Sequence, residues 1–323
     1  MRQGILALLR EAGDSYLSGE YIADKLGVSR TAVWKHINEL KAMGYNIDSQ
    51  ARNGYRLLGT PDRLLPEVIG HELGNEVIGS RIVAFEDIDS TNNEAKKMAA
   101  QGYPDGTVVV AESQNTGKGR LDRSFFCPRG GIWFSVILKP DFLPQEAPKC
   151  TLLAAVAITE AMRQFGLEAG IKWPNDILYQ GRKLVGILTE MSAEIDRINY
   201  VVIGMGINAI IDKDAFPEDI KDKAGSMSMF LGEFNRVAFF QEVLRRLESC
   251  YMQVRHEGFA GILDRWRALS ITLGADINVL GINESFAGRA VDIAEDGALL
   301  VQPQGSDKLS RVYAGDVSIR PRK

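Results

Sequence analysis

A glycine-rich basic segment at residues 114–123 constrains this chain more than any other feature of its sequence. It reads Gln-Asn-Thr-Gly-Lys-Gly-Arg-Leu-Asp-Arg and connects two apolar runs with strand character. Glycine lets backbone N–H groups approach a ligand closely, and Lys and Arg donate charge-assisted hydrogen bonds to phosphate or carboxylate oxygens. The pattern therefore predicts a loop between two strands that folds over an anionic ligand. A solvated basic hairpin loop is the alternative that the segment alone leaves open.

Length and charge limit what the whole molecule can be. The chain has 323 residues, of which 45% are hydrophobic, so two or three packed domains can form. Its formal net charge is −4, which excludes a uniformly basic nucleic-acid coat and confines any DNA-binding surface to one region. No apolar run approaches the length of a membrane span, and the first residues have a helical pattern rather than that of a signal peptide. We expect a soluble, cytoplasmic protein with no membrane partner.

The cysteines and histidines indicate no metal site. Cys127, Cys150 and Cys250 lie far apart, and their odd number and the lack of a CxxC pair predict reduced thiols. The three histidines do not have the spacing of metal ligands. We therefore expect no metal held by the protein alone, and no covalent catalysis by a histidine-activated side chain.

The first sixty residues have the pattern of a winged helix-turn-helix domain. A short helix after Ser18 ends at Gly27, and Ser29 is placed to cap a second helix with a buried face at i, i+4 and i+7. Two short strands follow, on either side of residues 50–53. Helix, tight turn, helix and hairpin in this order predict the winged helix.

Local charge indicates that this domain, residues 1–60, binds DNA. Between residues 25 and 56 there are six cations and two acidic side chains, a local charge of +4 on a chain of −4. Cations on the second helix and the hairpin suit contacts to phosphates. The candidates for DNA contacts are Ser29, Arg30, Thr31, Trp34, Lys35 and Arg52. A winged helix that makes only protein contacts is the alternative.

Beyond this domain the pattern changes twice. Residues 61–66 contain two prolines and no periodicity, so we predict a linker there. Residues 67–273 mix strands and helices, and we expect a mixed α/β sheet with helices on one face. The strands are expected at 82–85, 107–111, 132–138, 169–173, 183–191 and 199–203, and the helices at 93–100, 148–165 and 237–258. Residues 274–323 have short alternating strands with glycine turns, which predict a small barrel-like β domain.

Three further polar clusters lie in the central region. Asp89-Ser90-Thr91-Asn92 precedes a predicted helix, and its side chains either cap that helix or bind a polar ligand. A proline turn follows Lys172, and the next strand begins near Lys183. A hairpin-like pair of strands would bring these two lysines to the same anion, although either lysine alone is typical of surface charge.

The segment 201–208 contains Gly204-x-Gly206 after a strand and mimics a dinucleotide-binding fingerprint. That fingerprint requires a helix directly after the glycines, but the following residues are few, charged and stopped by Pro217. We therefore predict no Rossmann site, and no Walker A sequence is present. Together the clusters offer cations, backbone N–H groups and small polar side chains. This inventory suits a reaction in which the substrate supplies the nucleophile and the protein positions it and stabilises phosphate charge.

Taken in order, these motifs resemble the biotin–protein ligase family, in the form that is also a biotin-operon repressor. The resemblance covers essentially the whole chain. It implies an α+β multidomain fold with an N-terminal winged helix-turn-helix, a central mixed α/β ligase domain like that of class II synthetases, and a C-terminal SH3-like β-barrel. It rests on Asp89-Ser-Thr-Asn92, the loop from Gln114 to Arg123, Lys172-Trp-Pro-Asn-Asp176, Arg182-Lys183-Leu-Val-Gly186 and Gly204-x-Gly-Ile-Asn208.

The resemblance implies a two-step reaction. Biotin carboxylate attacks the α-phosphate of ATP, with Mg²⁺, to give biotinyl-5′-adenylate, and a lysine of a biotin carboxyl carrier protein then takes the biotinyl group. Arg120 and Lys183 are the implied catalytic residues. The implied ligand contacts are Ser90, Thr91, Asn92 and Gln114 at the biotin ring, Gly117, Lys118, Gly119 and Arg120 in the loop over the adenylate, and Arg123, Lys183, Gly186, Asn208 and Phe216 at the phosphates and nucleotide.

Regulation is implied by the same resemblance. The adenylate-bound protein would form a homodimer and bind operator DNA through the winged helix, so that ligand occupancy controls repression. The Gly-x-Gly after the strand would be a turn on the ligand side. The C-terminal domain would contribute to ATP or acceptor handling.

The basic loop departs at three positions from the family's common Gly-Arg-Gly-Arg-x-Gly-Arg-x-Trp. Lys118 replaces the first Arg, which keeps the charge and loses bidentate pairing. Asp122 replaces a Gly, and Phe125 replaces the Trp. Phe125 is expected either to stack on adenine or to pack against the sheet. These changes concern the energetics of loop closure and not the class of reaction.

Three other functions stay open. A lipoate–protein ligase has the same catalytic fold and adenylate chemistry, although Ser90, Thr91 and Gln114 favour a polar ureido head over a dithiolane. A ligand-responsive repressor without catalysis would use the central domain only as a sensor. A nicotinamide-binding redox repressor would change its DNA affinity with NADH.

Overall fold

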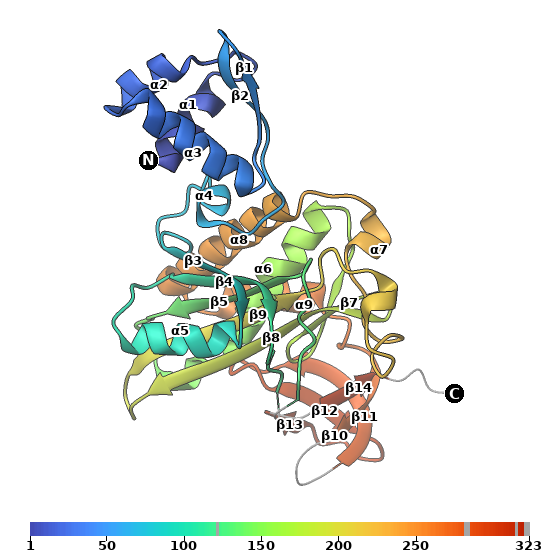
Figure 1. The fold of residues 1–323 in the computed structure, drawn as a ribbon. Coiled ribbons are helices and arrows are strands. Elements are labelled where there is room, and N and C mark those ends of the chain that lie inside the picture. The colour runs from blue at the N-terminus through green and yellow to red at the C-terminus, as the bar shows by residue number, and fades with distance from the viewer. Residues whose placement is uncertain (121–122, 281–284, 314–315, 320–323) are drawn as a thin grey trace. The chain divides into compact units, whose positions relative to one another are not determined.

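The computed structural model describes residues 1–120, 123–280, 285–313 and 316–319 (Figure 1). These form two compact units, Met1–Val68 and Ile69–Lys323. The region predicted as a separate C-terminal domain therefore belongs to the same unit as the central region, and the three-domain limits stay a prediction. Asp122, one of the departures in the basic loop, lies outside the described residues.

The N-terminal unit is a three-helix domain with a two-stranded wing, as predicted. The Ser18 and Ser29 hydroxyls accept the backbone N–H of Tyr21 and Ala32, and Gly27 ends the second helix with a left-handed φ of 66°. The buried faces of all three helices close one hydrophobic core. Its elements are α1 (Arg2–Glu11), α2 (Gly19–Leu26), α3 (Arg30–Ala42), β1 (Asn46–Gln50) and β2 (Gly54–Gly59), and the short helix α4 (Pro66–Ile69) contains the boundary between the two units.

A seven-stranded mixed sheet forms the centre of the second unit, in the order β3-β4-β5-β9-β8-β7-β6. Only β3 and β4 pair in parallel, and the other neighbours are antiparallel. The strand β7, which follows the proline turn, was not predicted from the sequence. The strands are β3 (Ile82–Ile88), β4 (Val108–Gln114), β5 (Ile132–Leu138), β6 (Gly170–Lys172), β7 (Asp176–Tyr179), β8 (Arg182–Ala193) and β9 (Ile198–Ile207).

Helices cover both faces of this sheet, so the expectation of helices on one face is wrong (Figure 1). The helix α5 packs its small side chains Ala95 and Ala99 on Val109, Ile137 and Val202 of one face. The other face carries α6, α8 and α9. The helical elements are α5 (Thr91–Ala100), α6 (Lys149–Gln164), α7 (Ser228–Leu231), α8 (Arg236–Glu257), α9 (Ala260–Leu269) and the 3₁₀ turns Pro144–Glu146 and Lys213–Ala215.

The two faces of the sheet differ in the size of the side chains that cover them. Phe134 of β5 points away from α5 and meets Phe240 of α8 with the ring centroids 4.7 Å apart. The helix α6 is buried along most of its length because it lies between the sheet and the helices α8 and α9. Large side chains thus fill the α6 face, whereas the α5 face has room for a pocket.

The C-terminal part of this unit is the expected small β domain, seen as a five-stranded antiparallel sheet in the order β13-β12-β11-β10-β14. Its buried side chains include Ala290, Leu299 and Val301. The strands are β10 (Asp276–Leu280), β11 (Ser285–Ile293), β12 (Leu299–Pro303), β13 (Ser310–Val312) and β14 (Asp316–Ile319).

The three cysteines are buried and none forms a disulfide. Burial raises the pKa of the Cys127 and Cys150 thiols to about 12, so both stay protonated at neutral pH. Across the described residues, no helix combines the length and the apolar character needed to cross a membrane.

Candidate functional site

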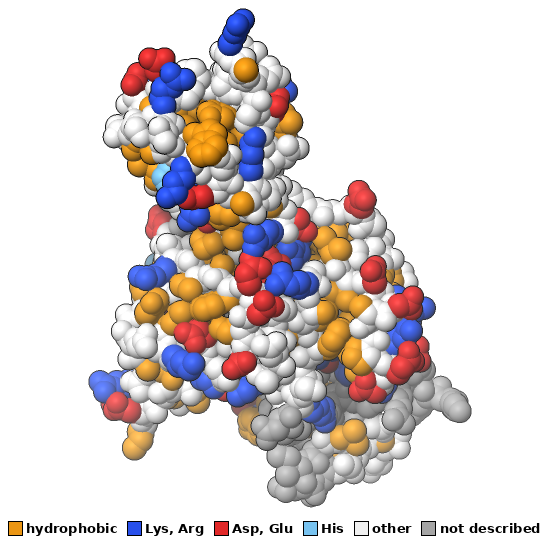
Figure 2. Space-filling view, viewed as in Figure 1, with side chains coloured by type: hydrophobic (Ala, Val, Ile, Leu, Met, Phe, Trp, Pro, Cys, Tyr) orange, Lys and Arg blue, Asp and Glu red, His pale blue; other side chains and the backbone are white. Residues whose placement is uncertain are grey.

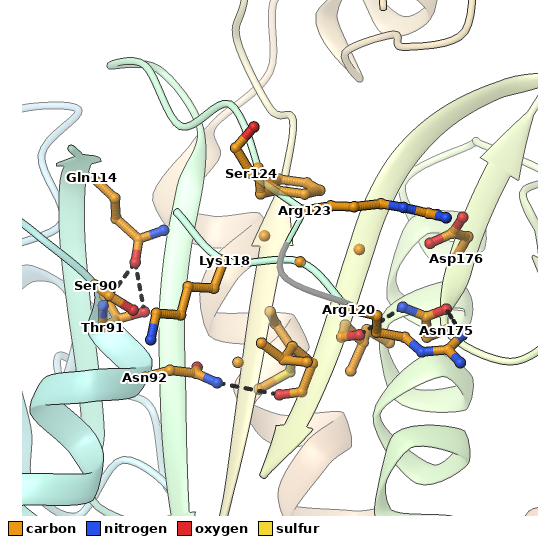
Figure 3. Close-up of a pocket in the computed structure, with 18 of the residues that line it drawn as sticks. Ser90, Thr91, Asn92, Gln114, Lys118, Arg120, Arg123, Ser124, Asn175 and Asp176 are labelled. Atoms are coloured by element: carbon orange, nitrogen blue, oxygen red, sulfur yellow. Dashed lines mark hydrogen bonds between the residues drawn. The ribbon is translucent and has the colours of Figure 1, made fainter. Parts of the chain in front are cut away.

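A pocket of about 160 Å³ opens on the α5 face of the central sheet (Figure 3). It is lined by the start of α5, the end of β4, the basic loop that follows it, the turn before β7, and the facing parts of β8 and β9. Segments far apart in the sequence therefore meet at one site. The predicted residues that it brings together are Ser90, Thr91, Asn92, Gln114, Lys118, Gly119, Arg120, Arg123, Lys183 and Gly186.

One end of the pocket is neutral and held by a chain of buried hydrogen bonds. The backbone N–H and hydroxyl of Thr91 donate to Gln114 Oε1, at 2.7 and 3.0 Å. The Ser135 hydroxyl on β5 bonds Thr91 Oγ1 at 2.8 Å and Asn92 Oδ1 at 2.6 Å. Ser90 caps α5 through its bond with the Asn93 N–H and also lines the pocket. Ser90 therefore does both things that were expected of this cluster: it caps the helix, and it faces the ligand cavity.

A charged pair behind this end orients Asn92. The Asn92 amide donates to Glu190 Oε2 at 2.8 Å, and Lys96 Nζ lies 2.6 Å from Glu190 Oε1. Burial would raise the pKa of Glu190, but the hydrogen bonds from Lys96 and Asn92 and the nearby charges of Lys96 and Lys118 outweigh it and lower that pKa. The carboxylate is therefore ionised at neutral pH, and Asn92 turns its amide NH₂ toward Glu190 and its carbonyl oxygen toward Ser135.

The other end of the pocket is cationic (Figure 3). Among the described lining residues, the cationic side chains there are Arg120, Arg123 and Lys183, with one carboxylate, Asp176, whereas Lys118 lines the pocket but extends its ammonium toward α5 at the first end. Lys183 Nζ lies 2.6 Å from Asp176 Oδ1, and Arg120 Nη1 donates to Asn175 Oδ1 at 3.3 Å. An anion that enters here meets a net positive charge set by side chains that already have defined positions.

The basic loop is a small hairpin that folds over the pocket. Lys118 and Ser124 form an antiparallel bridge, and the Gly119 and Phe125 N–H groups donate to Arg123 O and Gly117 O. A Cβ on Gly117 would lie 2.3 Å from Phe125 O, so only glycine allows this approach. Lys118 Nζ reaches α5 and donates to Asn93 Oδ1 at 3.1 Å. The loop therefore connects the neutral end to the cationic end.

Three glycines of β8 and β9 make the floor of the pocket. A Cβ at Gly204 would lie 1.9 Å from Asn92 Oδ1, and a Cβ at Gly206 or Gly186 would lie 2.7 Å from the Phe125 ring. Gly204 and Gly206 lie within β9, so the expected ligand-side turn is wrong, because the strand continues to Ile207. This continuity also explains why no dinucleotide-binding helix follows them.

Phe125 packs against the sheet, which is one of its two expected positions. Its ring covers Gly186 and Gly206, meets Trp133 edge-on at a centroid distance of 6.0 Å, and has Lys183 Nζ 5.3 Å from its centroid. The ring thus fills part of the floor of a cavity that is smaller than the roughly 300–1,000 Å³ of ordinary ligand pockets.

Three predicted residues, Gly117, Asn208 and Phe216, lie beside the pocket instead of in its lining. The Asn208 side chain is buried and donates to Gly225 O at 2.9 Å and to Lys183 O at 3.4 Å, so it supports the strand that carries Lys183. Phe216 is buried in a cluster with Cys127 and Trp133 and faces the ring of Phe126.

Asn175 and Asp176 are site residues that the sequence analysis quoted in a motif without assigning to the site. The signal was present, because two polar residues follow a proline turn, but their contacts depend on the unpredicted strand β7. Ser135 was missed altogether, since a lone serine within an apolar strand has no distinguishing pattern. The second cation expected from the hairpin is Lys183, and Lys172 lies outside the pocket lining.

A second surface lies on the N-terminal unit. All six predicted DNA-contact residues are exposed, and a groove of about 650 Å³ is lined by Arg30, Thr31, Trp34 and Arg52 among others. Trp34 is 59% exposed although it lies in the middle of α3. Figure 2 shows Lys and Arg side chains projecting from this unit around exposed hydrophobic surface. An exposed helix with a cationic start and a basic wing is the arrangement that enters a DNA groove in winged-helix proteins.

The fold and the site together define a ligase domain joined to a helix-turn-helix domain. Residues 2–56 match the model of an HTH domain, residues 84–208 that of the Biotin/lipoate A/B protein ligase family, and residues 272–320 that of the Biotin protein ligase C terminal domain. A biotin protein ligase from Aquifex aeolicus, solved in complex with biotin and ATP, superposes with a TM-score of 0.65 at 25% identity. The match covers 75% of this chain and all of that one.

Full-length relatives identify the family. The bifunctional ligase/repressor BirA of Bacillus spizizenii is 40% identical over 322 residues, which is 99% of this chain and 98% of that protein. The corresponding protein of Escherichia coli is 28% identical and covers 98% of this chain and 96% of its own length. The chain belongs to the biotin–protein ligase family, among the bifunctional ligase/repressors.

The glycine floor yields a stability prediction. Gly204→Ala places a methyl group against Asn92 and should lower the free energy of unfolding by about 1–3 kcal/mol, the usual effect of overpacking. Gly261→Ala is the matched control, because its methyl group would meet only the movable end of Gln253 at the start of α9. Urea denaturation should find the control unchanged or stabilised by up to about 1 kcal/mol. A Gly204→Ala protein as stable as the wild type would show that Asn92 does not pack on this floor.

Proposed function

We propose that this chain uses ATP to join biotin to a carrier protein and represses transcription through its winged helix when biotin is plentiful. The observation that carries the proposal is the division of one pocket into a neutral hydrogen-bonding end and a cationic end. A ureido ring with a carboxylate tail and a nucleotide triphosphate need these two environments side by side. We place this activity in the cytoplasm, where carrier proteins and operator DNA both occur.

In the first step a carboxylate oxygen of biotin attacks the α-phosphorus of ATP. The bond between the α-phosphorus and the bridging oxygen to the β-phosphorus breaks, and pyrophosphate leaves with the electron pair. The products are biotinyl-5′-adenylate and pyrophosphate. The reaction needs no protein nucleophile, and the pocket supplies position and charge stabilisation.

We assign the biotin ring to the neutral end. A ureido group has one carbonyl acceptor and two N–H donors, and the hydroxyls and amides of Ser90, Thr91, Asn92 and Gln114 offer both kinds of partner. Three of these side chains already have fixed orientations through their bonds with one another and with Ser135. Little ordering is then required when the ring binds.

We assign the phosphates to the cationic end. Arg120 and Arg123 bind the phosphates of ATP, and Lys183 stabilises the charge on the α-phosphate and carboxylate oxygens as the anhydride forms and breaks. Gly117, Lys118 and Gly119 become ordered as the loop closes over the adenylate. Gly186 has no side chain and therefore leaves room for the adenylate. Asn208 and Phe216 reach the nucleotide only if residues 208–225 rearrange on binding, because both are now buried beside the pocket.

The residues at the cationic end also fit a magnesium ion that arrives with the nucleotide. Mg²⁺ in nucleotide sites uses one or two carboxylates together with substrate phosphates, and prefers oxygen ligands. The carboxylate of Asp176 and the amide oxygen of Asn175 are the oxygen ligands that line the pocket there. Bound in this way, the metal would neutralise phosphate charge.

In the second step a lysine ε-amine of a biotin carboxyl carrier protein attacks the acyl carbon of the adenylate. The C–O bond to the phosphate breaks, AMP leaves, and the amine releases a proton as the amide forms. With the adenylate retained, we propose that two copies of the chain form a homodimer and bind operator DNA. The contacts to DNA would come from Ser29, Arg30, Thr31, Trp34, Lys35 and Arg52.

Lipoate transfer is the second candidate, because the matched family model covers both biotin and lipoate ligases. The polar neutral end favours biotin, since a dithiolane ring would cover the remaining donor and acceptor positions of these side chains without bonding them.

Pyrophosphate release tests the enzyme assignment. The purified protein with ATP should release pyrophosphate when biotin is added and not when lipoate is added. Lys183→Ala should lower the rate by at least ~100-fold, because it removes charge stabilisation from the reacting oxygens. Lys97→Ala, a change on the exposed face of α5, is the control that should keep the wild-type rate. Release with lipoate alone would move the assignment to the lipoate ligases, and no release with either would indicate a sensor.

Operator binding tests the regulatory half of the proposal. Protein with biotin and ATP should bind a palindromic operator at least about tenfold more tightly than the protein alone, as a coupling between two sites requires. Lys35→Ala should weaken binding and reduce the slope of log affinity against log salt by about 2, because a lysine that contacts one phosphate per half-site removes two contacts from the dimer complex. Fluorescence anisotropy measures both, with Lys97→Ala as the control. Equal affinity with and without ligands would disprove the coupling.

A further inference from the structure

The proline turn that carries Asn175 and Asp176 into the pocket is held from behind by the C-terminal β domain. Residues 173–175 connect β6 to β7, which begins at Asp176, and Trp173 is only 2% exposed. Its backbone N–H donates to the hydroxyl of Thr272 at 2.9 Å. Its indole N–H donates to the carbonyl oxygen of Gly297 at 3.2 Å. Both partners lie in the part of the chain that matches the Biotin protein ligase C terminal domain.

Neighbouring contacts fix this attachment, which we call the Trp173 latch and define as Trp173, Thr272 and Gly297. The N–H of Ile271 donates to Ile171 O at 3.0 Å, so the entry to the C-terminal domain runs beside β6. Thr272 is fully buried. A Cβ on Gly297 would lie 3.1 Å from Leu152, which places the turn at Gly297 directly on α6.

A buried lysine, Lys149, joins the turn at residues 295–297 to the central domain. Lys149 at the start of α6 donates to Glu295 O at 3.0 Å, pairs with Glu146 at 2.7 Å, and lies over the ring of Phe259. Its side chain is 7% exposed, so this contact is a docked interface and not a surface charge pair. The turn at residues 295–297 therefore has a defined position against α6 and against Trp173.

On its pocket side, the proline turn after Trp173 holds the two proposed catalytic cations, Arg120 and Lys183. The amide of Asn175 bridges β8 and the loop, because it donates to Ile187 O at 2.8 Å and accepts from Arg120 at 3.3 Å. Asp176 lies 2.6 Å from Lys183 Nζ. In the sequence, only Pro174 separates Trp173 of the latch from Asn175. A displacement of Trp173 is therefore transmitted to Asn175 and Asp176.

We infer that Trp173 and Thr272 are positioning residues for phosphate chemistry, through which the C-terminal domain sets the places of Arg120 and Lys183. The inference rests on the proposed ligase function. Within the described part of the chain, no hydrogen bond joins the side chains of the biotin end to the latch, since their contacts run through α5, β4, β5 and Glu190 of β8. Loss of the latch should therefore affect ATP and the rate of adenylation while the affinity for biotin is retained.

Two variants each remove one latch bond, Thr272→Val with little change of volume and Trp173→Phe with the loss of one ring of the buried indole. Thr272→Val deletes the hydroxyl that accepts the Trp173 backbone N–H, and Trp173→Phe deletes the indole N–H. Each should lower kcat for biotin-dependent pyrophosphate release by about tenfold to hundredfold and raise KM for ATP, because small misplacements of catalytic groups have effects of this size. KM for biotin should stay within about twofold of the wild-type value, since binding at the neutral end is undisturbed. Thr272→Ser keeps the hydroxyl and should restore the wild-type kcat.

Thr159→Val is the matched control. It also replaces a fully buried threonine, but that hydroxyl bonds Ala155 O within α6 and does not touch the turn. The control should lose less thermal stability than Thr272→Val, because Ala155 O keeps its backbone partner in the helix, and it should keep all three kinetic parameters.

A measurement independent of activity separates this inference from the proposed function. The Ile187 N–H donates to Asn175 O at 3.0 Å, so its hydrogen exchange reports on the turn. Exchange at Ile187 should be faster in Thr272→Val and Trp173→Phe than in the wild type and in Thr159→Val. A wild-type protein with no pyrophosphate release would refute the ligase proposal and leave this result standing. Folded latch variants with wild-type kcat, KM for ATP and Ile187 exchange would overturn the inference, as would an equal rise of both KM values.

Discussion

The candidate site depends on three adjacent strand positions that lack side chains. Gly186, Gly204 and Gly206 lie together on the α5 face of the sheet, beside the part of that face where α5 packs on Val109, Ile137 and Val202. A sheet that is packed on both faces has no free volume, since protein interiors are close-packed. Glycine at these positions lowers the floor enough for Asn92 and Phe125 to lie across it. The neutral and cationic ends of the pocket are the two sides of this hollow.

The two ends are held by different physical means, and the difference suits the chemistry. At the neutral end, buried hydroxyls and amides bond one another, so a ligand meets partners that are already oriented. At the cationic end, Arg120 and Lys183 are held by Asn175 and Asp176, which lie on a turn anchored in another part of the fold. When phosphate binds, its oxygens can replace Asn175 and Asp176 as the partners of these cations. This exchange leaves no buried charge behind, because Asp176 is only partly buried and can face water or a metal ion.

Local patterns in the sequence were enough to predict the winged helix, most strands and the helices α5, α6 and α8, although α9 was not predicted. Caps such as Ser29 and Gly27 act within one turn of their own residues, and the predicted ends of these helices agree with the structure. Strand β7 and the coverage of both sheet faces were not predicted, because they depend on pairing between distant segments. The role of Gly204 was misjudged for the same reason, since its neighbour Asn92 is far away in the sequence. Most candidate ligand residues do meet in one pocket, whereas Phe216 does not, because aromatic clustering with Phe126 decides its position.

The central claim is that the adenylate lies over the three glycines, with its ring system at the neutral end and its phosphate at the cationic end. A crystal structure of the protein with biotin and a nonhydrolysable ATP analogue tests this most directly. The account predicts ligand atoms in van der Waals contact with Gly204 and Gly206, the ring of Phe125 displaced from Gly186, and phosphate oxygens within hydrogen-bond distance of Lys183 and Arg120. A ligand bound elsewhere, with Phe125 still covering Gly186 and Gly206, would contradict it.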